Sequence, residues 1–339
     1  MDKDRCFWVG SAEWGDFLGR LVGEASVYAL GGEGGRFFYR QLIRKDIGDI
    51  VYNPVRAVQP LKSFIFSPRE EVVGPSDREG RKQTIIVGVK ACDISSLEIL
   101  DRALKETDLP DPVYQERRQR IVLISSDCSE PQETCFCTLV GRAPYPESGF
   151  DLNLSKVDGG FVVAVGSERG AELVDSHRSL FREATAEEIA RRDRDRGDIL
   201  RRVDRINESV AQKRSYQEIV KDSYSSELWV KHSESCVECT ACNNICPTCH
   251  CYLLDDVSGA EGFVKVRSWD SCVHTGYARV AGGLNPRPHL WERFRNRYLC
   301  KFLYMKENFG LLGCTGCGRC IEACQGKIDM REVLQELAG

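Results

Sequence analysis

The sequence predicts an α+β protein, with a mixed α/β domain over residues 1–213 and a mainly helical domain over residues 214–339. Three observations support this prediction. Short apolar runs and helical patterns are mixed in the first part, a highly charged segment follows, and twelve of the seventeen cysteines lie after Ser215. A chain of 339 residues is long enough for two domains, since single domains commonly contain about 100 to 200 residues.

The overall composition is that of an ordinary globular protein. Hydrophobic residues make up 42% of the chain, and 47 basic residues against 51 acidic ones give a net charge of −4. This balance provides no positive surface for a nucleic acid or an anionic membrane. No apolar run approaches the ~20 residues of a membrane-spanning helix, and the acidic N-terminus does not resemble a signal peptide. We therefore expect a cytoplasmic protein with no nucleic-acid partner and no membrane insertion.

Three apolar runs are candidate buried strands of the N-terminal domain: residues 84–89 (TIIVGV), 121–125 (IVLIS) and 161–167 (FVVAVGS). A helical pattern follows the first run, and Asp93 is expected to cap that helix. Cys92 and Cys128 come just past the carboxyl ends of the first two strands. Open α/β sheets build their sites from loops in this position, so both cysteines are candidate site residues.

Residues 184–213 are rich in arginine, aspartate and glutamate, with a few spaced isoleucines and valines. This pattern predicts an exposed helix with one thin apolar stripe. The interleaved carboxylates cancel the positive charge that a nucleic-acid site would need. We interpret the segment as a solvated helix that links the two domains.

Two copies of one cysteine motif carry the most specific information. The spacing C-x2-C-x2-C-x3-C occurs at residues 236–246, where proline follows, and again at residues 314–324, where Gln325 replaces the proline. In bacterial ferredoxins this spacing holds two 4Fe-4S clusters, and the fourth cysteine of each motif ligates the other cluster. We therefore predict a bacterial-ferredoxin-like dicluster domain with two 4Fe-4S clusters, one on Cys236, Cys239, Cys242 and Cys324, and the other on Cys314, Cys317, Cys320 and Cys246.

A long insertion, residues 247–313, separates the two motifs by 67 residues. It contains Cys249, Cys251 and Cys272, for which the sequence alone leaves metal binding open. A second stretch of the insertion, residues 287–306, is basic and rich in aromatic residues at helical spacing. That stretch is either a helix that packs its aromatic side chains inside the protein or a docking face in which Arg295 and Arg297 contact another protein of a complex.

The N-terminal domain contains a candidate set for a third iron–sulfur cluster: Cys92, Cys128, Cys135 and Cys137. Cys135 and Cys137 are alternate residues, so in an extended segment their side chains face the same way, as ligands of a soft metal do. Buried free thiols are the alternative, because cysteine often packs as a small hydrophobic residue.

The remaining candidates are weaker. Cys6 and Cys300 lack a spaced partner and are interpreted as packing residues. His250 and His274 lie near cysteines, but we assign structural roles to both. The glycines of residues 31–35 do not match the dinucleotide-binding fingerprint, and no flavin or nucleotide site is evident.

Four further motifs resemble those of a known family: ACD at residues 91–93, CFC at 135–137, CPTCxCY at 246–252 and SWxSC at 268–272. They are similar to motifs of the 4Fe-4S dicluster subunit of anaerobic sulfite reductase and of the beta subunit of cytoplasmic sulfhydrogenases, and the likeness extends from residue 84 onward. The resemblance implies an electron-transfer subunit between a flavin-containing subunit that oxidises NAD(P)H and a catalytic subunit, which is a sulfite or sulfur reductase or a NiFe hydrogenase.

The leading hypothesis is therefore an iron–sulfur electron-transfer subunit of a multi-subunit redox enzyme, with no catalytic residues of its own. One alternative is a reductase with its own catalytic iron–sulfur centre at the junction of the two domains. A second alternative is a structural zinc-binding module, although a zinc site has no need of the third evenly spaced cysteine in each motif. A disulfide framework is disfavoured, because cytoplasmic thiols stay reduced.

Overall fold

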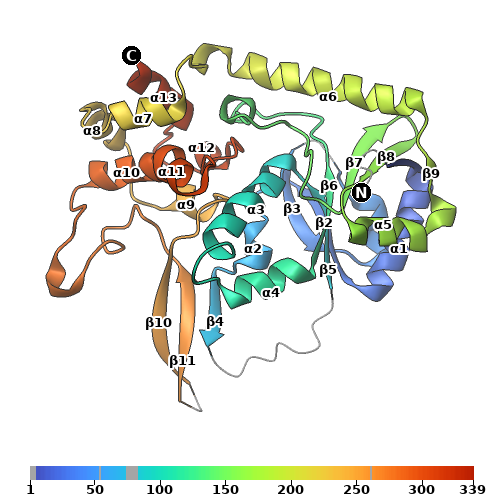
Figure 1. Ribbon diagram of the computed structural model, residues 1–339, viewed down its shortest axis with the longest axis horizontal. Helices are drawn as coiled ribbons and strands as arrows, with labels where there is room; N and C mark the ends of the chain where they lie inside the picture. Colours follow the sequence, from blue (N-terminus) through green and yellow to red (C-terminus); the bar gives the residue numbers. More distant parts are fainter. Residues whose placement is uncertain (1–4, 53–54, 74–82, 260–261) are drawn as a thin grey trace.

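The computed structural model describes residues 5–52, 55–73, 83–259 and 262–339 (Figure 1). A large mixed sheet occupies the N-terminal half, a projecting three-stranded sheet lies below it in the view, and a group of helices from the C-terminal part lies beside both (Figure 1). The first four residues, on which the expectation about a signal peptide partly depends, lie outside the described residues. Across the described ranges, no helix combines the length and apolar character needed to cross a membrane.

The large sheet has the strand order β3-β2-β5-β6-β7-β8-β1-β9. Its central strands β2, β5, β6 and β7 are parallel to one another, and the outer pairs are antiparallel. The three predicted strands are confirmed as β5, β6 and β8. The bounds are β1 (Cys6–Gly10), β2 (Ser26–Glu33), β3 (Arg36–Gln41), β5 (Thr84–Val89), β6 (Ile121–Ser126), β7 (Leu152–Val157), β8 (Gly160–Val165) and β9 (Arg182–Glu183).

Strand β5 is continuously apolar because both of its faces are buried. Ile85 and Val87 belong to one hydrophobic core, and Ile86 and Val89 belong to the core on the other face. The alternation shifts at Gly88, which has a φ of 83° and forms a bulge against β6. Helices cover both faces of the sheet, so the N-terminal part has three layers.

Helices α1 (Ser11–Glu24) and α5 (Glu168–Ser176) pack on one face of the sheet, and α2 (Lys62–Ile65), α3 (Ala91–Leu104) and α4 (Pro112–Arg120) pack on the other. The expectation that Asp93 caps α3 was wrong, because α3 begins at Ala91 and its N-cap residue is Lys90. Asp93 lies in the first turn and is fully buried. It accepts two hydrogen bonds from Arg319, at 2.9 and 2.6 Å. The short 3-10 helices of this part are η1 (Arg44–Asp49), η2 (Thr138–Val140) and η3 (Arg178–Leu180).

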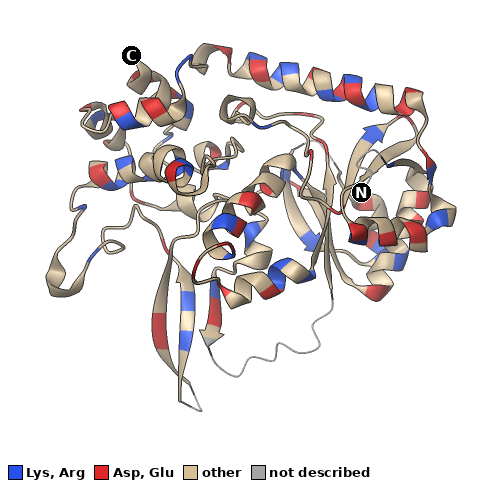
Figure 2. Cartoon of the chain, in the orientation of Figure 1, with Lys and Arg blue, Asp and Glu red and all other residues tan. Residues whose placement is uncertain are grey.

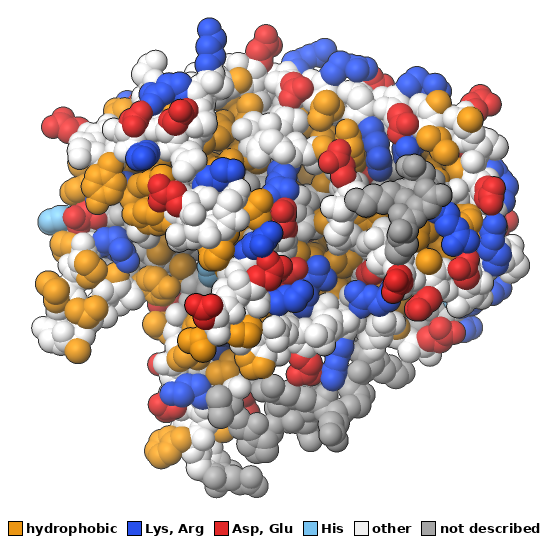
Figure 3. Space-filling model, in the orientation of Figure 1, with side chains coloured by type: hydrophobic (Ala, Val, Ile, Leu, Met, Phe, Trp, Pro, Cys, Tyr) orange, Lys and Arg blue, Asp and Glu red, His pale blue; other side chains and the backbone are white. Residues whose placement is uncertain are grey.

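The charged segment forms α6 (Ala186–Ile206), which runs along the top of the large sheet toward the helical part (Figure 1). A capping box between Thr185 and Glu188 begins the helix. Only Ile199 and Val203 of this helix are buried, which confirms the thin apolar stripe. Acidic and basic residues alternate along its exposed faces (Figure 2), and both signs are interspersed over the molecular face shown in Figure 3.

The helices of the C-terminal part share one hydrophobic core. Phe294, Tyr298 and Phe302 are buried in it, and Phe136 from the N-terminal part joins them. Arg295 and Arg297 are also buried, so these two arginines do not form an exposed docking face. The bounds are η4 (Glu208–Val210), α7 (Tyr216–Asp222), α8 (Leu228–Ser233), α9 (Ala241–Asn244), η5 (Ala281–Gly283), α10 (Leu290–Tyr298), the π-helix η6 (Leu299–Tyr304), α11 (Met305–Phe309), α12 (Arg319–Glu322) and α13 (Met330–Ala338).

The insertion forms a hairpin of β10 (Tyr252–Gly259) and β11 (Gly262–Trp269) before it continues into α10. Strand β4 (Arg69–Val73), from the first part of the chain, pairs antiparallel with β11 and completes the small sheet. Buried Arg267 of β11 forms an ion pair with Glu70 of β4. The domain boundary at residue 213 stays a prediction, and these contacts show that structure on its two sides is closely joined.

The buried ion pair between Arg319 and Asp93 generates a prediction about stability. Their side chains are 1% and 0% exposed, so Arg319→Met leaves a buried carboxylate without its cationic partner. We expect this variant to lose about 3–5 kcal/mol of unfolding free energy in urea titrations under anaerobic conditions. The exposed pair Arg102–Glu106 supplies the control, because Arg102→Ala should cost less than about 1 kcal/mol. Equal effects of the two substitutions would contradict the prediction.

Candidate metal centres

The two cysteine motifs adopt the same backbone conformation. The residues two and four positions after the first cysteine have positive φ in both: Glu238 (52°) and Thr240 (59°) in the first motif, Gly316 (64°) and Gly318 (73°) in the second. Left-handed residues alternating with ordinary ones curl a loop around a common centre and turn its N–H groups inward, as at many iron–sulfur sites. The repeated spacing thus corresponds to a repeated loop.

Each motif contains one short helix, α9 or α12, and these two helices pack against each other. Cys246 and Cys324 follow the ends of α9 and α12, so the fourth cysteine of each motif does not begin a helix. The replacement of proline by Gln325 therefore does not affect a helix start, since the next helix, α13, begins only at Met330.

Cys236, Cys239, Cys242 and Cys324, here called the first thiol set, lie close enough to influence one another. Burial raises the pKa of Cys236, and negative charge on Cys324 and Cys239 raises it further. Burial also raises the pKa of Cys242, and negative charge on Cys236 and Cys324 raises it further. The fourth cysteine of the second motif thus lies near Cys236 and Cys242 of the first motif.

Cys246, Cys314, Cys317 and Cys320, here called the second thiol set, line one internal cavity together with Thr315, Arg297 and Lys301. Burial raises the pKa of Cys314 to about 12 and that of Cys320 to about 11, so both thiols keep their protons at neutral pH unless a metal replaces them. The hydroxyl oxygen of Thr315 is buried and lacks a hydrogen-bond partner among the described residues. A sulfur-rich cluster in the cavity would accept its hydrogen bond, so the lining fits an iron–sulfur cluster.

Three buried cations surround the second thiol set: Lys62, Arg297 and Lys301, which are 2%, 6% and 3% exposed. Lys301 Nζ contacts Thr248 Oγ1 and Gly313 O at 2.8 and 3.0 Å, and Arg297 Nε contacts Asn243 Oδ1 at 2.9 Å. Within the part of the chain that the structure describes, none of the three pairs with a carboxylate. Burial lowers the pKa of Lys301, but negative charge on Cys246 and other thiols outweighs it and holds that pKa well above its ordinary value. Buried cations require buried anions, and a cluster held by the thiolates of this set would supply them.

Cys92, Cys128, Cys135 and Cys137, here called the third thiol set, line a second cavity. Cys92 comes from the first turn of α3, Cys128 follows β6, and the CxC pair belongs to the loop before η2. Burial raises the pKa of Cys128 to about 11. Arg56 also lines this cavity, and its buried Nε lacks a hydrogen-bond partner among the described residues. The structure thus brings together four cysteines that are spread over 46 residues of sequence.

The second and third thiol sets share a wall. Cys317 lines both cavities, and Gly316 lines the cavity of the third set. The Phe136 N–H donates to the Gly316 carbonyl at 2.8 Å. A Cβ at Gly316 would lie 2.5 Å from backbone atoms of Cys137, and one at Gly318 would meet the carbonyl oxygen of Thr134. Glycine at these positions therefore permits both the positive φ and the close approach of residues 134–137.

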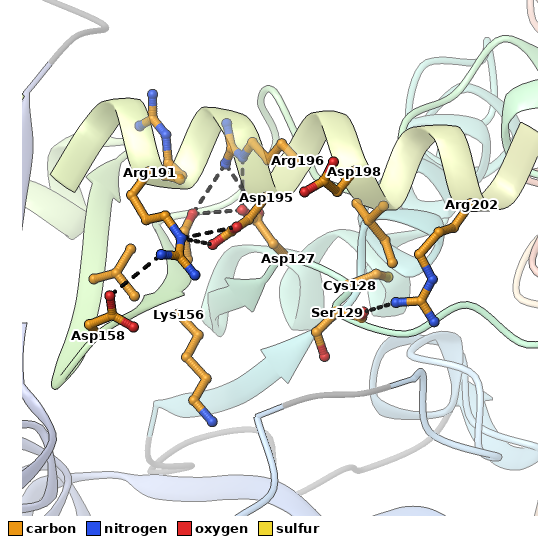
Figure 4. A pocket seen from close by; sticks show the side chains of 14 residues that line it. Asp127, Cys128, Ser129, Lys156, Asp158, Arg191, Asp195, Arg196, Asp198 and Arg202 are labelled. Atoms are coloured by element: carbon orange, nitrogen blue, oxygen red, sulfur yellow. Dashed lines mark hydrogen bonds and ion pairs between the residues drawn. The ribbon is translucent and has the colours of Figure 1, made fainter. Parts of the chain in front are cut away.

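A polar network around Asp127, the residue before Cys128, holds this part of the loop in place. Asp127 accepts hydrogen bonds from Asn153 Nδ2 at 2.9 Å, Ser155 Oγ at 2.6 Å and Arg196 Nε at 2.7 Å. Figure 4 shows Arg196 reaching from α6 to Asp127 in an open pocket that Cys128 also lines. Several other charged side chains of this pocket form ion pairs, such as Arg191 with Asp195. Arg202 Nη1 donates to the Ser129 carbonyl at 3.1 Å, so α6 also supports the loop that follows Cys128.

The histidines and the two isolated cysteines have contacts that suit structural roles. His250 Nδ1 lies 3.0 Å from Thr248 O, and exposed His274 Nδ1 lies 2.7 Å from Asp270 Oδ1. Cys6 accepts a contact from Arg192 at 3.4 Å, and Cys300 lies near Cys272. Among the described residues, no three His, Cys, Asp or Glu side chains converge closely enough to hold one metal ion. The second and third thiol sets each place four cysteines around one cavity, and four is the number of ligands that a 4Fe-4S cluster takes.

Comparison with known proteins agrees with the cysteine pattern. A protein-family model described as a 4Fe-4S dicluster domain matches residues 235–328, which include both motifs and the insertion. The chain is also 30% identical over 328 residues to sulfhydrogenase 2 subunit beta of Pyrococcus furiosus, and the match covers 95% of each chain. An alignment of this length must extend well before residue 84, where the sequence motifs gave little indication of likeness. The predicted family is confirmed: the chain belongs to the family of sulfhydrogenase beta subunits.

Proposed function

We propose that this chain carries single electrons along a row of three 4Fe-4S centres, held by the first, second and third thiol sets. The observation that carries the proposal is the position of Cys317, which lines the cavities of both the second and the third set. The packing of α9 on α12, with the exchange of fourth cysteines, supports a similar closeness of the first and second sets. Bound 4Fe-4S clusters supply sites that accept and release one electron at a time.

The protein's own residues tune and shield these sites. Arg297 and Lys301 place positive charge where an added electron would lie, and Thr315 offers its hydroxyl proton to a cluster sulfur. The buried aromatic core around Phe136 and Tyr298 keeps water from the second set. No nucleophile–base pair is needed for this role, since the chemistry is electron transfer alone.

We further propose that the chain works in a cytoplasmic complex, between a flavin-containing subunit that oxidises NAD(P)H and a catalytic subunit of the sulfite reductase, sulfur reductase or NiFe hydrogenase kind. Two findings support this assignment. The related protein from Pyrococcus furiosus is by its name one subunit of a sulfhydrogenase. In the present chain, Cys317 lines the cavities of both the second and the third thiol set, as neighbouring sites for electrons between a donor and an acceptor would require.

The number of clusters can be tested by iron content. We expect about twelve iron atoms per chain in anaerobically purified protein, and about eight after Cys135→Ser and Cys137→Ser are combined. Cys6→Ser is the matched control, because Cys6 lies in β1 and contacts Arg192 instead of other thiols. The third centre would be ruled out if wild-type protein contained about eight iron atoms per chain and all four thiols of the third set could be alkylated.

The buried cations predict a shift in reduction potential. Lys301→Met removes a positive charge beside the second thiol set, so the reduced and more negative state loses stabilisation. We expect the potential of one cluster to fall by on the order of 50 mV in a spectroscopic redox titration. Lys301→Arg should retain most of the wild-type potential, and Lys306→Met, on the exposed side of α11, should leave it unchanged. A potential unaffected by Lys301→Met would show that this cation does not act on a cluster.

The relay itself can be tested in the purified complex. We expect the rate of NAD(P)H-driven turnover to fall at least tenfold in the variant that combines Cys135→Ser and Cys137→Ser. Turnover should stay normal when a dye reduces the catalytic subunit directly. The isolated wild-type chain should not turn over sulfite, polysulfide or hydrogen with an artificial electron donor. Turnover by the isolated chain would instead favour a reductase with its own catalytic iron–sulfur centre.

A further inference from the structure

Five cysteines lie outside the three thiol sets, and two of them touch each other. Cys251 and Cys272 are 21 residues apart in sequence, yet their thiols are in hydrogen-bond contact. The contact forms at the base of the β10–β11 hairpin, where the Asp270 N–H donates to the Cys251 carbonyl at 3.0 Å. A tight turn after Asp270, with Ser271 N–H donating to Asp270 Oδ1 at 2.7 Å, then brings Cys272 back toward Cys251.

Polar neighbours are aimed at both sulfurs. Asn243 is 1% exposed, and its Nδ2 donates to the Cys272 sulfur at 3.2 Å. Arg297 Nε donates to Asn243 Oδ1 at 2.9 Å, which fixes the amide with its NH2 group toward Cys272. The Tyr277 hydroxyl contacts the Cys251 thiol, and the hydrogen bonds from Cys272 and Tyr277 outweigh burial and lower the pKa of Cys251 to about 7. Inert buried thiols have no need of such donors, whereas a sulfur that becomes a thiolate does.

The pair lies next to the first thiol set. Asn243, which contacts Cys272, directly follows Cys242 in sequence. The Asn243 side chain contacts both sulfurs, because Cys242 Sγ lies 3.6 Å from Asn243 Oδ1 and Asn243 Nδ2 donates to the Cys272 sulfur. Electrons can therefore pass between this pair and the first set over a short distance.

We propose that Cys251 and Cys272 form a redox-active dithiol that stores two electrons as a pair beside the first iron–sulfur centre. In the oxidised form, an S–S bond joins the two sulfurs. Reduction breaks this bond, takes up two electrons and two protons, and leaves two thiols. The electrons come one at a time from the chain's reduced iron–sulfur centres, so the inference rests on the proposed electron-transfer function, and the protons come from water.

Disulfide mapping of the holoprotein tests this role. Anaerobic samples are oxidised with thionine or reduced with dithionite, quenched in acid, alkylated with N-ethylmaleimide and digested for mass spectrometry. We expect a peptide pair joined through residues 251 and 272 in the oxidised sample only. In a reductive titration, the Cys251→Ser variant and the Cys272→Ser variant should each accept about two electrons per chain fewer than the wild-type protein. The iron content of both variants should equal that of wild type.

Cys6→Ser is again the control and should change neither the electron uptake nor the linked peptide. The proposal is overturned if oxidised wild-type protein contains no linked peptide, or if the serine variants take up as many electrons as wild type. It is also overturned if those variants lose about four iron atoms, because the two cysteines would then be cluster ligands. Failure of the dithiol would leave the iron content and the NAD(P)H-driven relay of the wild-type complex as proposed, so the two hypotheses fail separately.

Discussion

The close packing of residues 134–137 on the second cysteine motif is the contact on which the arrangement of the candidate metal sites depends. Gly316 and Gly318 allow the two backbones to meet, since side chains at either position would collide with Cys137 or Thr134. The Phe136 ring then enters the core of the helical part. Through this contact, a loop that follows a strand of the large sheet becomes one wall of the ferredoxin-like region. Cys317 in turn comes to border two cavities lined by cysteine.

Charge pairing reinforces the same junction. Arg319 directly follows the glycine that contacts Thr134, and it binds buried Asp93 at the start of α3. Arg56 lies between the third thiol set and Glu322 of α12, to which its NH2 group donates at 2.7 Å. Lys301 and Arg297, in contrast, have thiols as their anionic neighbours. The buried cations therefore have two roles. Arg319 and Arg56 pair with carboxylates that join the two parts of the chain, whereas Lys301 and Arg297 balance the charge of the thiol sites.

Much of the site could be predicted from sequence, because ferredoxin-type spacing encodes its own geometry. The strands β5, β6 and β8 were evident from apolar runs. Cys92 and Cys128 were selected because they follow two of these strands, and the structure places both in the lining of one cavity. The buried cations could not be found in this way, since Lys62, Arg56 and Lys301 are single residues with no characteristic spacing. Asp93 was misread because a carboxylate near a helix start suggests a cap, whereas its partner is more than 200 residues away in sequence.

Other features depend on long-range pairing that a single sequence does not reveal. The pairing of β4 with β11 joins residues almost 200 positions apart, and it supports the hairpin that carries Cys251. The aromatic residues of α10 and η6 had the right spacing for a helix, but their spacing was equally consistent with an exposed face. Their burial against α7, α8 and α13 decided between the two interpretations.

The central claim is that three iron–sulfur centres lie in a row, with Cys317 between the second and the third. Anomalous scattering at the iron absorption edge, from crystals of anaerobically purified protein, tests it most directly. The account predicts three groups of iron peaks, one of them enclosed by Cys92, Cys128, Cys135 and Cys137 and next to Cys317. Two groups of peaks only, with no iron among those four cysteines, would contradict it.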